Sequence, residues 1–349
     1  MKERIVMGLC GLAVTAALGG CGTGPAHEGE VVLEGVRAAP PGATPGAQRV
    51  PGGPPGQPPE GRTSGEPERF APGVISDHRE QYRITFTPSG DTAYFGAADG
   101  FFPQTRQASI NRSVRVDGAW QTPEVAPFSG EHPDIDPFIT PDGEWLYFSS
   151  IRPSEAGVPD VVDLWRVPRE AEGWGPPERV SASTPRDDLY PSLDLEGRLY
   201  FGNPIEAVEG PGHWRVVGAQ PAGDGYDGWY EEPVPIPGGV NTETHWAFNP
   251  AVSPDGRRLL FTRLNPTDPQ ATGFGELYTA HLDGEGTEAR WSDPVNLGPP
   301  VNTPQDEFHP ALSPDGRWLY FIRRDPFADD PKGDLYRIEV DAVAALADR

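Results

Sequence analysis

The segment His309-Pro-Ala-Leu-Ser-Pro-Asp-Gly-Arg-Trp-Leu-Tyr-Phe321 decides the fold, because the chain repeats it. A second copy is Asn249-Pro-Ala-Val-Ser-Pro-Asp-Gly-Arg-Arg-Leu-Leu-Phe261, and three further copies lie at 83–95, 136–148 and 190–201. The turn glycines of the five copies, spaced by 53, 54, 59 and 60 residues, are Gly90, Gly143, Gly197, Gly256 and Gly316. Such a period indicates an array of similar structural units.

Each copy predicts a β-hairpin. A short apolar strand runs into Ser/Thr-Pro-Asp-Gly, where Pro presets φ and Gly takes the left-handed position, and a second strand ends in Phe. A third strand follows, as at 163–167, 276–280 and 334–338, and a fourth follows a Trp and a Pro. Four antiparallel strands in each of five units predict an all-β β-propeller. The longer spacings of the later copies leave room for a degenerate sixth blade.

The end of the repeat predicts how the ring closes. The last copy stops after its third strand, and Phe70-Ala-Pro-Gly-Val-Ile75 aligns with the end of a fourth strand at Leu297 to Val301. We therefore expect an N-terminal strand to complete the fifth blade and to leave no long unpaired edge. The predicted domain is a single propeller of five four-stranded blades over residues 70–340, with 341–349 as a tail. We expect Trp120, Trp174, Trp229 and Trp291 to pack between blades.

The beginning of the chain is typical of an export signal. Lys2 and Arg4 precede an apolar stretch over 5–18, and two small glycines precede Cys21. The run Leu18-Gly-Gly-Cys21 resembles a bacterial lipobox, which implies that residues 1–20 are a signal peptide and that the Cys21 thiol carries lipid. Gly22, where an inner-membrane retention signal would have Asp, then favours an outer-membrane lipoprotein facing the periplasm or the cell surface. An ordinary secretory signal with an incidental cysteine is the alternative.

Residues 21–69 predict a disordered tether. The stretch from Gly22 to Arg69 holds 10 Pro and 11 Gly. Such a composition offers too little apolar surface to fold. A Pro-rich ligand for a partner is the alternative reading.

Composition excludes several functions. The net charge of -24 repels phosphate backbones, so we expect no nucleic-acid partner. Both cysteines, Cys10 and Cys21, lie at the start, so the repeats contain no disulfide and no thiolate metal site. The sequence also has no Gly-x-Ser-x-Gly, Gly-Lys-Ser/Thr loop or His-Glu-x-x-His motif.

The Ser-Pro-Asp-Gly-x-x-Leu-Tyr-Phe repeats resemble the TolB-type, WD40-like (PD40) propeller repeats of exported bacterial proteins. The resemblance covers about residues 70–340, although Ser89 and the segment 194–196 depart from the turn pattern. That family includes binding lipoproteins, translocation components and propellers joined to hydrolases. The resemblance implies a membrane-anchored, monomeric, non-catalytic scaffold that binds a protein or an envelope polymer. A carbohydrate-active enzyme, glycosidase- or lyase-like, stays open as the alternative.

The repeats in register indicate candidate site residues. Eight residues before each turn glycine stands an apolar residue, which predicts core: Tyr82, Ile135, Leu189, Phe248 and Phe308. The positions seven and nine before are mostly polar and differ between blades, which predicts one heterogeneous site at the channel mouth. Its candidates are Arg83, Asp134, Asp136, Asp188, Tyr190, Asn249, Glu307 and His309.

Three chemistries remain open for this mouth. Asp136, Asp188 and Glu307 are the candidates for a pair of catalytic carboxyl groups. His132, His245 and His309 are the candidates for binding a divalent cation such as Zn or Mn. The third reading, which we favour, is a polar, water-filled mouth without a cofactor that binds a peptide or nothing specific.

Overall fold

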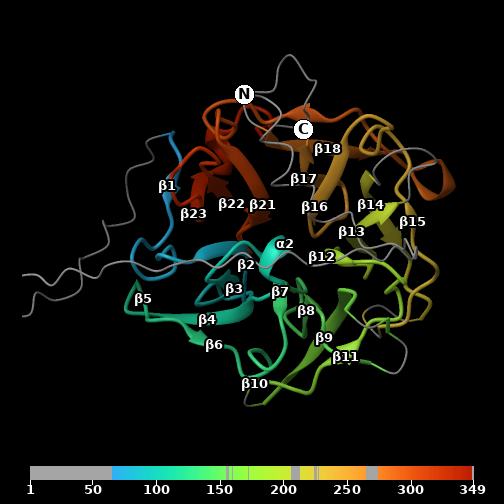
Figure 1. Ribbon diagram of the computed structural model, residues 1–349. Coiled ribbons are helices and arrows are strands. Elements are labelled where there is room, and N and C mark those ends of the chain that lie inside the picture. Colours follow the sequence, from blue (N-terminus) through green and yellow to red (C-terminus); the bar gives the residue numbers. More distant parts are fainter. Residues whose placement is uncertain are drawn as a thin grey trace, which may run out of the picture.

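The computed structural model describes residues 65–154, 157–158, 160–171, 173–205, 213–223, 226, 228–264 and 274–347. The strands in these ranges form five antiparallel sheets and no sixth, and Figure 1 shows them as a ring around a common axis. The all-β, five-bladed prediction is therefore confirmed. The predicted signal peptide, the predicted lipidation site Cys21 and the predicted tether up to residue 64 lie outside the described residues.

In blades 1 to 4 the strands follow one another outward from the axis in chain order, and in blade 5 the N-terminal β1 is the outermost strand. The outer strand of each blade is short or split into two pieces. Blade 1 contains β2 (Glu80–Phe86), β3 (Thr92–Ala98), β4 (Ser109–Val116), β5 (Ala119–Trp120) and β6 (Glu124–Val125). Blade 2 contains β7 (Asp134–Ile139), β8 (Trp145–Ser150), β9 (Asp163–Glu170), β10 (Gly173–Trp174) and β11 (Glu178–Arg179). Blade 3 contains β12 (Leu189–Leu193), β13 (Leu199–Ile205), β14 (His213–Ala219) and β15 (Val234–Pro235).

Blade 4 contains β16 (Trp246–Val252), β17 (Arg258–Leu264), β18 (Gly275–Asp283), β19 (Arg290–Trp291) and β20 (Val295–Asn296). Blade 5 contains β21 (Asp306–Leu312), β22 (Trp318–Arg324), β23 (Gly333–Glu339) and β1 (Glu68–Arg69). The helices among the described residues are one turn each: α2 (Phe102–Thr105), η2 (Gly286–Glu288) and η3 (Val340–Ala342). Within the ranges given above, no helix has the length and apolarity to cross a membrane.

The repeat motif forms the predicted hairpin in every blade. The five turn glycines have φ between 69° and 78°, the left-handed region that glycine enters without steric cost. In blade 5, the Trp318 backbone N–H donates to Ser313 Oγ at 2.9 Å. Blade 3 lacks this serine, and Asp194 replaces it by accepting the N–H groups of Glu196 and Arg198, each at 3.0 Å. The departure from the motif therefore leaves the hairpin in place.

The core lies between neighbouring blades. One phenylalanine of the motif is fully buried in each second strand: Phe95, Phe148, Phe201, Phe261 and Phe321. Five apolar clusters each join two adjacent sheets, and a sixth surrounds the axis. Trp120, Trp174 and Trp291 pack against these clusters, as expected. The expectation is wrong for Trp229, which is 67% exposed because Tyr230 beside it takes the inward position and hydrogen-bonds Tyr147 at 3.1 Å.

The N-terminal strand closes the ring in the predicted blade. β1 pairs antiparallel with β23, and the Arg337 guanidinium lies 2.7 Å from the Glu68 carboxylate. The next residue, Phe70, donates its N–H to the Leu335 carbonyl at 2.8 Å and is buried between blades 5 and 1. The closing strand starts two residues before the predicted segment 70–75, whose side chains pack behind it.

A polar clamp that the sequence reasoning did not single out holds each connection between blades. A Ser or Asn just before the innermost strand bonds the backbone of the third strand of the preceding blade. Asn302, for example, accepts the Leu277 N–H and donates to the Leu277 carbonyl, both at 2.9 Å. The other members are Ser76, Ser129, Ser183 and Asn241. These clamps fix where each innermost strand begins and so position the axial site.

Candidate functional site

An irregularity in each innermost strand points side chains toward the axis. The pairing of the first two strands shifts register in all five blades, at the same place in blades 2 to 5 and one residue earlier in blade 1. In four blades, the residue seven before the turn glycine has φ between 52° and 67°, namely Asp136, Tyr190, Asn249 and His309. Such left-handed conformations are uncommon for residues other than glycine, and they cluster at functional sites. The β-bulge breaks the strand alternation and re-aims the side chain.

This bulge explains why two successive residues line one pocket. In a regular strand, neighbours point to opposite faces. Here Phe248 and Asn249 both line the axial pocket, and so do Phe308 and His309. Blade 1 supplies a natural comparison: Arg83 is absent from the residues with positive φ, and it lines a separate cavity on the turn side, while Tyr82 stays in the axial pocket.

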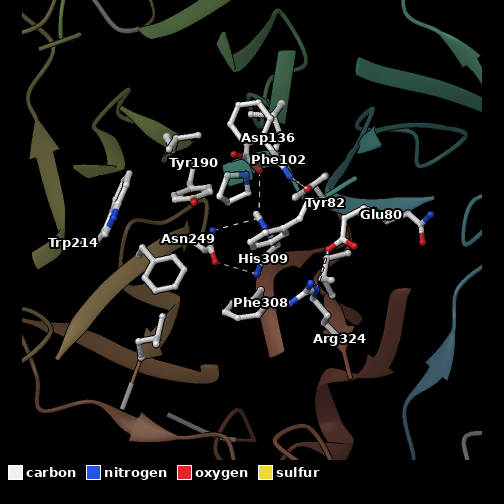
Figure 2. Close-up of a pocket in the computed structure, with 18 of the residues that line it drawn as sticks. Glu80, Tyr82, Phe102, Asp136, Tyr190, Trp214, Asn249, Phe308, His309 and Arg324 are labelled. Carbon is white, nitrogen blue, oxygen red and sulfur yellow. Dashed lines mark hydrogen bonds and ion pairs between the residues drawn. The ribbon is translucent and has the colours of Figure 1, made fainter. Parts of the chain in front are cut away.

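The axial pocket is a mostly apolar cup (Figure 2). Its polar floor is formed by the four left-handed residues, Asp136, Tyr190, Asn249 and His309. The cavity has a volume of about 70 Å³, which suits one side chain or one ring of a ligand. Its aromatic wall is formed by Tyr82, Phe101, Phe102, Tyr190, Trp214, Trp246, Phe248 and Phe308. Pockets of this kind, apolar with a few convergent polar groups, are the usual form of a ligand site.

His309 joins the polar side chains of the floor. Its Nδ1 lies 3.3 Å from Asp136 Oδ1 and 3.3 Å from Asn249 Nδ2, and Figure 2 shows both contacts. The ring meets Tyr82 and Tyr190 edge-on, with centroids 5.6 and 5.5 Å apart. Asp136 is fully buried, and neither carboxylate oxygen accepts a hydrogen bond from any residue that the structure describes. The floor therefore holds an unsatisfied acceptor.

The rim of the pocket has one ion pair. Arg324 Nε lies 3.4 Å from Glu80 Oε1, and the guanidinium also covers the Phe101 ring at 4.5 Å. Burial raises the pKa of Glu80, and the Arg324 charge opposes that rise. On the far side of the floor, burial lowers the pKa of Arg83 to about 10, while the Asp136 charge opposes that fall. Arg83 donates through Nη1 to the Pro191 carbonyl at 2.9 Å.

The candidates nine residues before the turn glycine lie within their own blades. Asp134 pairs with Arg152 at 2.7 Å, and Glu307 pairs with Arg323 at 2.8 Å. Asp188 accepts the Thr184 N–H at 2.5 Å and Asn203 Nδ2 at 2.7 Å. Burial raises the pKa of both Asp188 and Glu307 to about 7, against these donors. None of the three lines the axial pocket.

The histidine candidates are dispersed. His309 lines the pocket, whereas His132 and His245 lie in the connections that lead into the innermost strands. His245 Nδ1 is bonded to the Thr244 hydroxyl at 2.9 Å. Over the described ranges, no group of three or more His, Cys, Asp and Glu side chains is placed to hold a metal ion.

Several pocket residues escaped the sequence reasoning. The residues assigned to the core eight positions before the glycine are also pocket wall, because the bulge turns them to the same side as the polar residue. In blades 2 to 5, a Pro follows the left-handed residue of the innermost strand, as in Asp136-Pro137 and His309-Pro310. Blade 1 has no Pro at this position, so the Pro was the available signal for the bulge. The repeats gave no signal for four further pocket residues, because the other blades do not repeat them: Phe101, Trp214, Trp246 and Arg324.

Comparison with known proteins finds likeness to solved structures only. No protein-family profile and no curated protein sequence matches the chain. Among solved structures, the α-L-arabinofuranosidase of Lactobacillus brevis is 14% identical with a TM-score of 0.49, covering 77% of this chain and 92% of that one. The Bacillus subtilis arabinanase Arb43A is 12% identical with a TM-score of 0.47, covering 75% and 94%. A TolB candidate from Agrobacterium tumefaciens is 14% identical with a TM-score of 0.45, covering 72% and 73%. At these identities the likeness concerns the propeller fold alone.

Proposed function

We propose that this chain is an exported lipoprotein whose propeller is a non-catalytic scaffold that binds a protein or an envelope polymer through its axial pocket. The observation that carries the proposal is the floor of the pocket. Four blades hold a different polar side chain there, each in a left-handed backbone conformation that costs free energy of order 1–3 kcal/mol. A role in packing alone would tend to place the same residue type in each blade, as the buried phenylalanines do.

The positions of the carboxyl groups support binding over hydrolysis. A glycosidase needs two carboxyl groups that face each other across the scissile bond. Of the three candidates, only Asp136 lines the pocket, and Asp188 and Glu307 are occupied by donors of their own blades. The other pocket carboxylate, Glu80, is paired with Arg324. The same constellation suits a receptor for a protruding group of a partner.

The membrane anchor rests on the sequence before the propeller. The Cys21 thiol at the end of the lipobox-like run would carry the lipid, and the Pro-rich residues 22–64 would reach roughly 130 Å when extended at about 3.1 Å per residue. This arrangement would hold the propeller at the outer membrane while it meets its partner. A Cys21→Ala variant should leave the membrane fraction when cells are fractionated. Full retention of this variant in the membrane would contradict the anchor.

Stripping one polar side chain from the pocket floor tests the binding role. Asn249→Gly suits a position with φ of 52°, so it removes the amide without adding backbone strain. The variant should keep its thermal midpoint within a few degrees and capture at least tenfold less partner from solubilised envelope. Asp117→Gly is the matched control, because Asp117 also has positive φ but lies in an exposed turn. Equal capture by wild type and Asn249→Gly would refute the axial pocket as the binding site.

A further inference from the structure

The floor of the axial pocket contains a buried carboxylate that the described protein leaves unsatisfied. Asp136 is 0% exposed, and its two oxygens accept no hydrogen bond among the described residues. Its nearest basic atom is His309 Nδ1 at 3.3 Å from Oδ1, and that nitrogen is also contacted by Asn249. Burying a carboxylate without partners is costly, so the arrangement favours a ligand that brings a donor to Asp136.

Two other cations lie near the pocket: Arg324 at the rim, and Arg83, whose charge interacts with that of Asp136 from beyond the floor. Arg324 pairs with Glu80 at the rim. Arg83 lies beyond the floor, lines the cavity on the turn side and donates to the Pro191 carbonyl. A ligand entering from the open side of the cup therefore approaches two carboxylates, Glu80 and the fully buried Asp136, from the side opposite to Arg83.

The aromatic wall and the overall charge both favour a cationic ligand. Aromatic faces attract cations through their ring quadrupole, and the cup is lined by Tyr82, Phe102, Tyr190, Trp214 and Phe248. The chain carries a net charge of -24, which raises the local concentration of cations and repels anions. A hydroxyl group could bond Asp136 but would not compensate its charge. The small volume admits a head group and its stem.

We propose that the axial pocket takes a protonated amine or a guanidinium group carried by the partner, with Asp136 as its counter-ion. This inference rests on the proposed binding function and adds the chemistry of the ligand. A lysine or arginine side chain of a protein partner fits this description. The stem lies along the aromatic wall, and the charged tip reaches the floor.

Small probes test the inference on the full chain. Nα-acetyl-lysine methylamide, whose side-chain amine is free, should bind at least tenfold more tightly than Nα-acetyl-norleucine methylamide, which has the same stem without the amine. Fluorescence of Trp214 and Trp246, both in the pocket wall, and calorimetry report the binding. Asp136→Asn should weaken binding of the lysine probe at least tenfold. Glu285→Gln, which removes a carboxylate that is 89% exposed, should leave it unchanged.

The probe series on the wild type keeps the inference falsifiable even if Asp136→Asn does not fold. Equal binding of the lysine and norleucine probes, or tighter binding of a neutral methyl glycoside, would overturn the inference. Unchanged lysine binding in a folded Asp136→Asn variant would also overturn it. In each case the proposed function would survive if Asn249→Gly still loses the partner, so the two failures are distinguishable.

Discussion

Replacing Phe70 by Ala should lower the free energy of unfolding by about 3–5 kcal/mol, the usual cost of truncating a buried phenylalanine. Phe70 is 3% exposed and its ring contacts Tyr320 of blade 5 at 5.0 Å and Phe86 of blade 1 at 6.1 Å, between ring centroids. It also follows the strand that closes the ring, so its loss loosens the pairing of β1 with β23. Denaturant unfolding monitored by circular dichroism measures the change.

Phe327→Ala is the matched control for this prediction. Phe327 belongs to the same blade but is 71% exposed, so its truncation should change the free energy of unfolding by less than about 0.5 kcal/mol. A loss of less than about 1 kcal/mol for Phe70→Ala would mean that the ring does not depend on the N-terminal segment for closure.

Replacing Glu307 by Ala should cost about 3–5 kcal/mol at pH 8, because it leaves a guanidinium that is only 12% exposed without its counter-ion. Arg323 lies 2.8 Å from the Glu307 carboxylate, and Thr303 donates both its N–H and its hydroxyl to the same group, at 3.0 and 2.7 Å. At pH 8 this carboxyl, whose pKa burial raises to about 7, is mostly ionised. Denaturant unfolding at this pH gives the difference.

An exposed ion pair supplies the comparison for Glu307. Glu285 lies 3.8 Å from Arg257, and both side chains are exposed, so Glu285→Ala should cost no more than about 1 kcal/mol. A Glu307→Ala variant that keeps wild-type stability and yet loses partner binding would return Glu307 to the functional site.

The fold could be predicted from the sequence because its decisive signals are local. Ser-Pro-Asp-Gly sets a turn through the backbone preferences of Pro and Gly, and five copies of that turn fix five blades. The closure of blade 5 by the N-terminal segment also followed from local pattern, although the pairing strand is 68–69 and the predicted segment 70–75 follows it. Trp229 was misjudged because the choice between it and Tyr230 depends on a contact with Tyr147, a residue of another blade.

The site could be predicted only in part, because the bulge decides it. Register along the repeat identified the positions of Asp136, Asn249 and His309, which line the axial pocket. It could not separate them from Asp188 and Glu307, since a regular strand would put residues two apart on the same face. The β-bulge breaks that rule and assigns one set to the pocket and the other to contacts inside the blade.

Photo-crosslinking from the pocket rim tests the central claim most directly. A benzophenone amino acid at Phe101, which lines the axial pocket, should yield an adduct with the partner in envelope preparations, and the same group at the exposed Phe327 should not. The adduct should disappear when Asn249→Gly is combined with the probe at position 101. An adduct that forms from position 327 and not from position 101, or one that persists in the Asn249→Gly background, would contradict binding through the axial pocket.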